Sequence, residues 1–237
     1  MSLLVDGFKE AIELLISGND SVYSAIIVTI TVSSWSILIS LILGLPLWFL
    51  LGYYQFKGKT VIKTIVDTFL AFPTVVIGLL VYTTLSQAGA FGEYNLLFTQ
   101  KAIIIGQIFL GLPIIIALTA AQVESTDKRL YLSLKGLGAK PYQILLTTLV
   151  EARFGLMTAA MTAYGRIITE IGISMMVGGN IKYHTRTITT AISLETGKGE
   201  FETGIALGLV LFIVALIVNI ALSMLKRRWT QWIFYMN

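Results

Sequence analysis

Residues 21–56, SVYSAIIVTITVSSWSILISLILGLPLWFLLGYYQF, contain no Asp, Glu, Lys or Arg. This run is longer than the about 20 apolar residues that a helix needs to cross a bilayer. It predicts a membrane-spanning helix that tilts, protrudes from the membrane or bends near Pro46. One long helix and a helix broken near Pro46 are both compatible with the run.

The rest of the chain also has the composition of a membrane protein. Of its 237 residues, 56% are hydrophobic and 13% are charged, whereas soluble domains carry about 25% charged residues. Four further runs with few charges are long enough to cross the bilayer. We therefore predict an all-α integral membrane protein, a single domain over residues 1–237 with about five spans. The predicted spans are residues 22–54, 64–87, 102–123, 154–177 and 204–225.

The distribution of Lys and Arg predicts how these spans are oriented, because cytoplasmic loops carry an excess of both. With the N-terminus outside, 11 of the 17 Lys and Arg fall in inside segments, 5 fall in outside segments and Arg166 falls within a span. This predicts an external N-terminus and a cytoplasmic C-terminus, which requires an odd number of spans. Residues 1–20 are predicted to form a helix on the outer face of the membrane, with a plain extension of the first span as the equal alternative.

The longest inside segment, residues 124–153, has apolar residues at helical spacing and a break at Gly136-Leu137-Gly138. Pro141 follows, and proline is favoured in the first turn of a helix. We predict a helix, a glycine turn and a short second helix at the cytoplasmic surface. Such a hairpin suits docking of a soluble partner, and equally a surface connector that has no partner.

Within this segment, LSLKGLGAKPYQILLTTLV (132–150) resembles the cytoplasmic coupling loop of the permease subunits of ABC importers. The glycine, small, basic, proline and aromatic residues at 138–142 match the core of that loop, while Leu132, Ser133 and Leu134 replace its Glu-Ala-Ala opening and Glu151 replaces its terminal proline. The resemblance implies that this loop couples the chain to an ATPase. The implied coupling residues are Ser133, Gly136, Gly138, Ala139, Lys140, Pro141 and Tyr142.

The resemblance becomes more specific in three other stretches, YGRIITEIGISMMVGGNI (164–181), TRTITTAISLETGKGEF (185–201) and GFKEAIELLISGND (7–20). They are similar to the permeases of tungstate importers, and molybdate and sulfate permeases share a looser version. The resemblance implies a type I importer in a prokaryotic cell membrane, built from two copies of this chain and two cytoplasmic ATPase subunits that hold ATP and Mg²⁺. An extracytoplasmic binding protein would deliver the oxyanion.

Two charged residues, Arg166 and Glu170, lie four positions apart in a predicted span and therefore on one helical face. An arginine in mid-membrane costs about 2.5–3.5 kcal/mol even on the lenient insertion scale, so it must face protein or water. It either lies beside the pathway of a dianion, with Glu170 holding it in place, or forms with Glu170 a structural ion pair that locks this helix to its neighbours. The candidate pathway residues are Arg166, Glu170, Gly172, Gly179, Asn180, Thr185 and Arg186.

The threonines of the outside loop have two interpretations. They donate hydrogen bonds to an oxyanion near the entrance, or they cap and line a short surface helix that includes residues 187–196. The second interpretation is the favoured one. Gly178, Gly179 and Asn180 are typical of a tight turn after a span.

Several other chemistries find no support in the sequence. The chain has no cysteine, which excludes disulfides and thiolate metal sites. His184 is its one histidine, so no histidine–carboxylate cluster predicts a zinc site. Gly52 and Gly58-Lys59-Thr60 have the wrong spacing for a phosphate-binding loop. We predict no catalytic residue, no metal and no cofactor on this chain. The net charge of +4 comes from residues that flank spans and predicts no nucleic-acid partner.

Two other functional classes fit the sequence less well than an importer. A secondary transporter or channel subunit is expected to show internal hydropathy repeats and coupling carboxylates in its spans. The sequence shows no convincing repeat, and the carboxylates within its predicted spans are Glu170 and Asp67. An intramembrane enzyme would need a nucleophile paired with a base, or metal ligands, and the spans contain neither arrangement.

Overall fold

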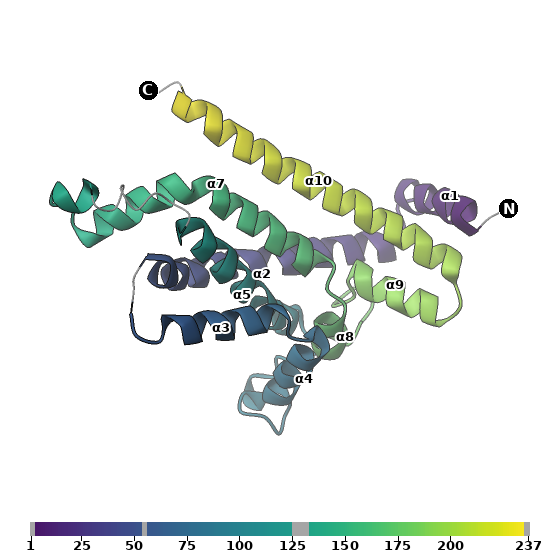
Figure 1. Ribbon diagram of the computed structural model, residues 1–237. Helices are drawn as coiled ribbons and strands as arrows, with labels where there is room; N and C mark the ends of the chain where they lie inside the picture. The colour runs from purple at the N-terminus through teal and green to yellow at the C-terminus, as the bar shows by residue number, and fades with distance from the viewer. Residues whose placement is uncertain (1–2, 54–55, 125–132, 235–237) are drawn as a thin grey trace.

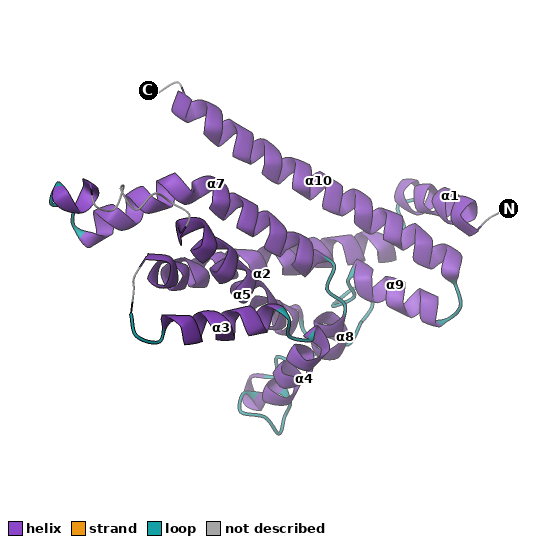
Figure 2. Ribbon diagram, in the orientation of Figure 1, coloured by secondary structure: helices purple, strands orange, loops and turns teal. Residues whose placement is uncertain are grey.

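The computed structural model describes residues 3–53, 56–124 and 133–234, and these residues form helices and connecting turns without a strand (Figures 1 and 2). The helices with defined bounds are α1 (Leu3–Ile16), α2 (Asp20–Tyr53), α3 (Lys59–Leu70), α4 (Thr74–Leu85), the 3₁₀ helix η1 (Gly92–Tyr94), α5 (Gln100–Glu124), α7 (Pro141–Ile168), α8 (Gly172–Gly178), α9 (Ile188–Gly197) and α10 (Phe201–Phe234). Residues 133–136 form a further helical turn before α7.

Four of these helices, α2, α5, α7 and α10, are long and apolar enough to cross a membrane. The pair α3 and α4 supplies a fifth crossing if its two bent halves are taken as one span. The prediction of an all-α membrane protein with about five spans is therefore confirmed. The external N-terminus stays a prediction. In Figure 1 the start of α7 and the end of α10 lie at one end of the molecule, whereas α1 and α9 lie at the other.

The first apolar run forms one continuous helix. α2 extends over 34 residues and includes Pro46, so this proline does not end it. Proline is tolerated within membrane helices because neighbouring groups and local adjustments satisfy the freed carbonyl. Pro113 lies within α5 in the same way.

The predicted single helix over residues 64–87 is wrong. The structure has two helices, α3 and α4, that are bent by 98° relative to each other across a short break. Pro73 is the physical reason, because proline disfavours the helical conformation of the residue before it. Pro73 itself adopts an extended conformation (φ −62°, ψ 125°) and precedes the first turn of α4. The first of the two helices, α3, also begins before the predicted span, at Lys59.

The predicted span 154–177 and the predicted short second helix of the 124–153 loop also need correction. The structure joins that short helix to the span as one helix, α7, which begins at Pro141 and ends at Ile168. Residues 172–178 form the separate helix α8. Apolar spacing gave no signal for the break at 169–171. Residues 125–132 of the loop lie outside the described residues.

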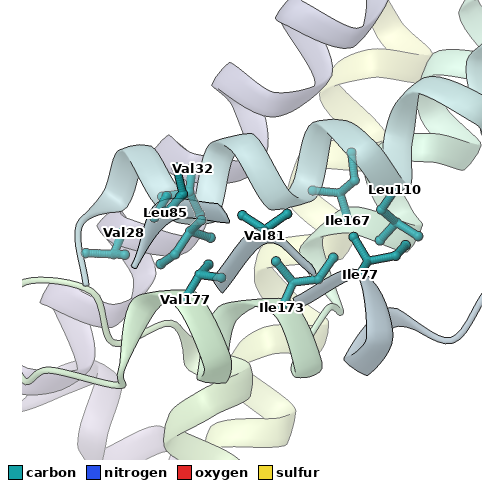
Figure 3. Packing of buried hydrophobic residues seen from close by; sticks show 11 residues of the cluster. Val28, Val32, Ile77, Val81, Leu85, Leu110, Ile167, Ile173 and Val177 are labelled. Carbon is teal, nitrogen blue, oxygen red and sulfur yellow. The ribbon is translucent and has the colours of Figure 1, made fainter. Parts of the chain in front are cut away.

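The main core lies where α2, α4, α5, α7 and α8 meet (Figure 3). Its fully buried side chains include Val32, Ile103, Ile167 and Ile173. Small residues allow the helices to approach closely, as is usual in membrane bundles. A Cβ added to Gly106 of α5 would lie 2.3 Å from Ile173 Cγ2 of α8. The absence of a side chain at Gly106 therefore lets α5 and α8 pack closely.

A second core lies at the other end, where α2, α9 and α10 meet, with Val22, Ile188 and Val210 among its buried residues. α1 packs along α10 (Figure 1). A Cβ added to Gly7 would lie 2.7 Å from Ile205 Cγ2. The small Gly7 therefore lets α1 rest directly on α10. The placement of α1 on the outer face of a membrane stays a prediction.

Candidate functional site

The predicted coupling residues lie in a helical turn at 133–136, the connection at 137–140 and the start of α7. We call residues 133–142 the hairpin. The Ala139 N–H donates to the Leu134 carbonyl and the Gly138 N–H donates to the Lys135 carbonyl, each over 3.0 Å. This pair of bonds is the Schellman arrangement, which ends a helix with a residue in the left-handed conformation. Gly138 is that residue, with φ 75°. A side chain at this position would strain the backbone, so the glycine has a defined structural role.

The hairpin continues directly into α7. Lys140 is extended, and its N–H donates to Gln143 Oε1 over 2.7 Å. Pro141 is the first residue of the helix, where its fixed φ fits and its missing N–H costs nothing. The turn is therefore held by backbone geometry at both ends.

Most of the hairpin is exposed to its surroundings. Ser133, Gly136, Gly138, Lys140, Pro141 and Tyr142 are exposed, and Ala139 is half-buried. Leu137, which the sequence analysis did not select, is the most exposed large apolar side chain of the described part of the chain, at 84%. The signal that could have found it is an apolar residue between two glycines at a turn. Leu137 and Tyr142 give this tip an apolar surface suited to a partner.

Arg166 and Glu170 form the predicted pair, with Arg166 Nη1 2.9 Å from Glu170 Oε2. The two side chains have different surroundings, because the Arg166 side chain is 46% exposed and that of Glu170 is 2% exposed. Glu170 Oε1 also accepts the Ile173 N–H of α8 over 3.2 Å. The Glu170 carbonyl accepts the hydroxyl of Thr189. Glu170 therefore fixes the start of α8 and anchors a later loop, while Arg166 presents a charge at the surface of the single chain.

The two breaks in the helices lie beside each other. A Cβ added to Gly172, at the start of α8, would lie 3.2 Å from Thr74 Oγ1 and 3.1 Å from Val75 Cγ2, at the start of α4. Gly172 thus permits the close approach of α8 and α4. The predicted residues Arg166, Glu170 and Gly172 meet at this junction.

The other four predicted residues form a folded turn after α8. Gly179 and Asn180 both have positive φ, 69° and 51°. The Thr185 hydroxyl donates to the Gly178 carbonyl and accepts the Ile181 N–H. Arg186 Nε donates to Asn180 Oδ1 over 3.1 Å. The described contacts therefore divide the seven candidates into one group at the junction and another at this turn.

Threonines of this loop begin α9, as the favoured interpretation predicted, but this start of the helix is buried and does not lie at the surface, since Thr187, Thr189 and Thr190 are at most 3% exposed. The Thr190 N–H donates to Thr187 Oγ1 over 3.3 Å, and the Thr187 N–H donates to Thr190 Oγ1 over 2.9 Å. This reciprocal pair satisfies two amides that the first turn of a helix leaves free. The Ile188 N–H donates to Thr29 Oγ1 of α2 and ties α9 to the bundle.

Arg186 also lines a cavity of about 820 Å³ where α1, α2, α9 and α10 meet. Lys182 and Lys198 line it as well, together with the carboxylates Asp20 and Glu195. Lys198 and Glu195 form an ion pair of 2.9 Å. Among the described residues, no group of three or more His, Asp or Glu is placed to hold a metal ion.

Comparison with known proteins adds a family and relatives. The model of the family "Binding-protein-dependent transport system inner membrane component" matches residues 36–231. The tungstate uptake system permease protein TupB of Campylobacter jejuni is 51% identical over 96% of this chain and 95% of its own length. TupB of Peptoclostridium acidaminophilum is 34% identical over 95% of this chain and 99% of its own length.

A solved structure shares the fold. The chain aligns with a bacterial ABC transporter involved in the import of the acidic polysaccharide alginate, with a TM-score of 0.75 and 22% identity, over 93% of this chain and 83% of the other. At this identity the likeness concerns the fold alone.

Proposed function

Since the chain belongs to the family of binding-protein-dependent transport system inner membrane components, we propose that it is the permease of an ATP-driven importer whose cargo is tungstate. The observation that carries the choice of cargo is the 51% identity to a tungstate permease over 96% of the chain. A relationship of that extent covers the hairpin, the junction and the outer turn together. The motifs in residues 164–181 and 185–201 support the same cargo.

We infer that the hairpin is the docking site of a cytoplasmic ATPase. The proposed contact residues are Ser133, Gly136, Gly138, Ala139, Lys140, Pro141 and Tyr142. We add Leu137 to these proposed contacts, because its exposed apolar side chain lies at the tip. A turn that backbone hydrogen bonds hold in one conformation can transmit a force to α7, whereas a flexible loop would absorb it.

α7 gives this docking site a mechanical role. It is one helix of 28 residues, which corresponds to a length of about 42 Å. Its start carries the hairpin, and its last turn carries Arg166. A displacement of the hairpin by the ATPase therefore moves the junction of the two breaks through a continuous helix. ATP and Mg²⁺ would bind to the ATPase subunits, and this chain would bind no cofactor.

The proposed pathway runs between two copies of the chain. Arg166, Glu170 and Gly172 would lie along it, and Gly179, Asn180, Thr185 and Arg186 would lie toward the side where the binding protein delivers the oxyanion. Because Glu170 balances Arg166 at 2.9 Å, the pair attracts a passing dianion less than an unpaired arginine would. A permease must release its cargo, so this balance suits passage.

The test is uptake into proteoliposomes that contain this chain, its ATPase and its binding protein. Tungstate is expected to accumulate when ATP is present and to remain outside when ATP is omitted. Molybdate and sulfate are tetrahedral dianions like tungstate, so both are added in competition. Preferential uptake of either one would overturn the choice of cargo. Uptake by the chain alone, driven by an ion gradient, would overturn the importer and support a secondary transporter.

A further inference from the structure

The C-terminal half of α7 has an unusual exposed face, whereas its N-terminal half exposes apolar side chains such as Leu146 and Val150. Between residues 154 and 169, every residue that is exposed in the single chain is polar. These residues are Thr158, Thr162, Arg166 and Thr169. At 100° per residue they fall within a stripe about 80° wide on the helix. We call these four residues the polar stripe.

Contact with lipid would be energetically unfavourable for the polar stripe. The threonine hydroxyls alone would tolerate it, because those of Thr158, Thr162 and Thr169 donate to carbonyls three or four residues back, which satisfies the donor within the helix. Arg166 is different, since 46% of its side chain is exposed. A charged guanidinium facing hydrocarbon is costly, and such residues face protein or water-filled cavities.

The break between α7 and α8, which follows the stripe, also argues against contact with lipid. Thr169 and Ile171 are exposed at the break between α7 and α8, and Ala71 and Pro73 are exposed at the break between α3 and α4. In the breaks the regular helical pattern of hydrogen bonds ends, and Ala71, Phe72 and Glu170 donate their N–H groups to carbonyls three residues back. Irregular backbone at membrane depth occurs only where protein buries it or where it lines a water-filled cavity. Two such breaks lie together at Gly172, so this surface is not in contact with lipid.

Water accounts for this surface better than close packing against a second copy. Membrane helices pack tightly through hydrogen bonds between helices or through small residues in direct contact. The hydroxyl protons of the three threonines are already donated to the backbone of α7. The stripe instead presents hydroxyl oxygens and one cation, which water can solvate.

From these observations we propose that the polar stripe, with the break after it, forms a wall of the water-filled pathway along which the tungstate dianion crosses. This inference rests on the proposed function for the identity of the anion. The wall is polar enough to keep water in contact with the anion. Its single exposed charge is balanced by Glu170, so the wall guides the anion without holding it.

The absence of cysteine from the chain makes a labelling experiment direct. Thr162→Cys is introduced into the full chain, assembled with its ATPase in membrane vesicles, and treated with a charged, water-soluble methanethiosulfonate. The reactive form of cysteine is the thiolate, which forms only where water solvates its charge. Ala159→Cys, on the buried face of the same helix, and Ile217→Cys, on the exposed apolar face of α10, are the matched controls. Thr158→Cys, one turn earlier, replaces Thr162→Cys if the latter fails to assemble.

We expect Thr162→Cys to react at least about tenfold faster than either control, which corresponds to a difference of one unit in the logarithm of the thiolate fraction. The rate is also expected to change when ATP is added, because the pathway opens and closes. Labelling as slow as that of Ile217→Cys would place the stripe in lipid and overturn the inference. A spontaneous disulfide between two copies would place it in a closed contact and overturn it equally.

The experiment distinguishes an error in the proposed pathway wall from an error in the proposed cargo. Fast labelling of Thr162→Cys in a transporter that accumulates molybdate in preference to tungstate supports the wall and overturns the cargo. Slow labelling in a transporter that accumulates tungstate overturns the wall and leaves the cargo in place. The uptake assay and the labelling assay are run on the same vesicles.

Discussion

The two long helices α7 and α10 carry opposite exposed faces. The exposed side chains of α10 between Phe212 and Met224 are apolar apart from Asn219, and Phe212 and Ile217 are 65% and 61% exposed. Over the C-terminal half of α7 the exposed residues are those of the polar stripe, whereas its N-terminal half exposes Leu146 and Val150. An apolar face suits lipid, whereas a face with threonines and an arginine suits water or protein. The contrast assigns α10 to the periphery of the proposed transporter and α7 to its centre.

The largest expected effect comes from the hairpin that begins α7. Gly138→Val places a β-branched side chain at φ 75°, where the left-handed conformation costs about 1–2 kcal/mol for an ordinary residue. The turn will reorganise, and we expect ATP-driven tungstate uptake to be lost. Uptake assays and co-purification of the ATPase measure the effect. Gly197→Ala, at the end of α9 where an added Cβ meets nothing, is the control. Normal uptake by Gly138→Val would refute the coupling role of the hairpin.

A smaller effect is expected at the end of α7. Arg166→Ala leaves the carboxylate of Glu170 buried without its ion-pair partner. We expect the complex to lose about 2 kcal/mol of stability, the range of a hydrogen bond to a charged group, with some compensation by water that reaches this exposed site. Thermal unfolding of the purified transporter is the measurement.

Two further variants make the test at Arg166 specific. Adding Glu170→Gln to Arg166→Ala removes the unpaired charge and keeps an oxygen for the Ile173 N–H, so part of the stability should return. Asn219→Ala, on the exposed face of α10, should change the stability by less than about 0.5 kcal/mol. Equal stability of Arg166→Ala and the unaltered chain would mean that Glu170 does not need the arginine.

The next largest effect is expected when the polarity of the two faces is exchanged. Thr162→Leu makes the polar stripe more apolar, and Ile217→Thr makes the face of α10 more polar. We expect Thr162→Leu to fold normally and to slow tungstate uptake between about twofold and tenfold, equivalent to about 0.4–1.4 kcal/mol in a barrier. Ile217→Thr should leave the uptake rate unchanged. Should Ile217→Thr slow uptake more than Thr162→Leu, the assignment of the two helices would be reversed.

The smallest effect concerns a glycine of α10. A Cβ added to Gly208 meets no atom within 4 Å, and alanine is favoured over glycine in helices by up to about 1 kcal/mol. Gly208→Ala should therefore raise the thermal stability slightly. Gly106→Ala in α5 is the opposing variant, because its Cβ would lie 2.3 Å from Ile173 Cγ2 and overpacking costs about 1–3 kcal/mol. A loss of stability in Gly208→Ala would mean that a second copy packs against this part of α10.

The sequence was sufficient where the cause is local. The absence of charge in residues 21–56 predicts a membrane helix, because each charged residue is costly in hydrocarbon. Gly138 and Pro141 predict a helix end and a helix start, because both restrict the backbone at their own positions. The four-residue spacing of Arg166 and Glu170 predicts their pairing, which the structure places at 2.9 Å.

Other features depend on which helices meet. The break at 71–73 has a local cause in Pro73, but apolar spacing gives no signal for the break at 169–171. The adjacency of the two breaks at Gly172 comes from the contact between α4 and α8. The exposure of Leu137 and of the polar stripe depends on what the remaining helices leave uncovered. Hydropathy and turn chemistry are properties of neighbours in the chain, so the sequence alone is enough to place this protein in the membrane and to mark its hairpin. Burial is a property of neighbours in space, so the folded bundle is needed to separate the face of α7 that meets water from the face of α10 that meets lipid.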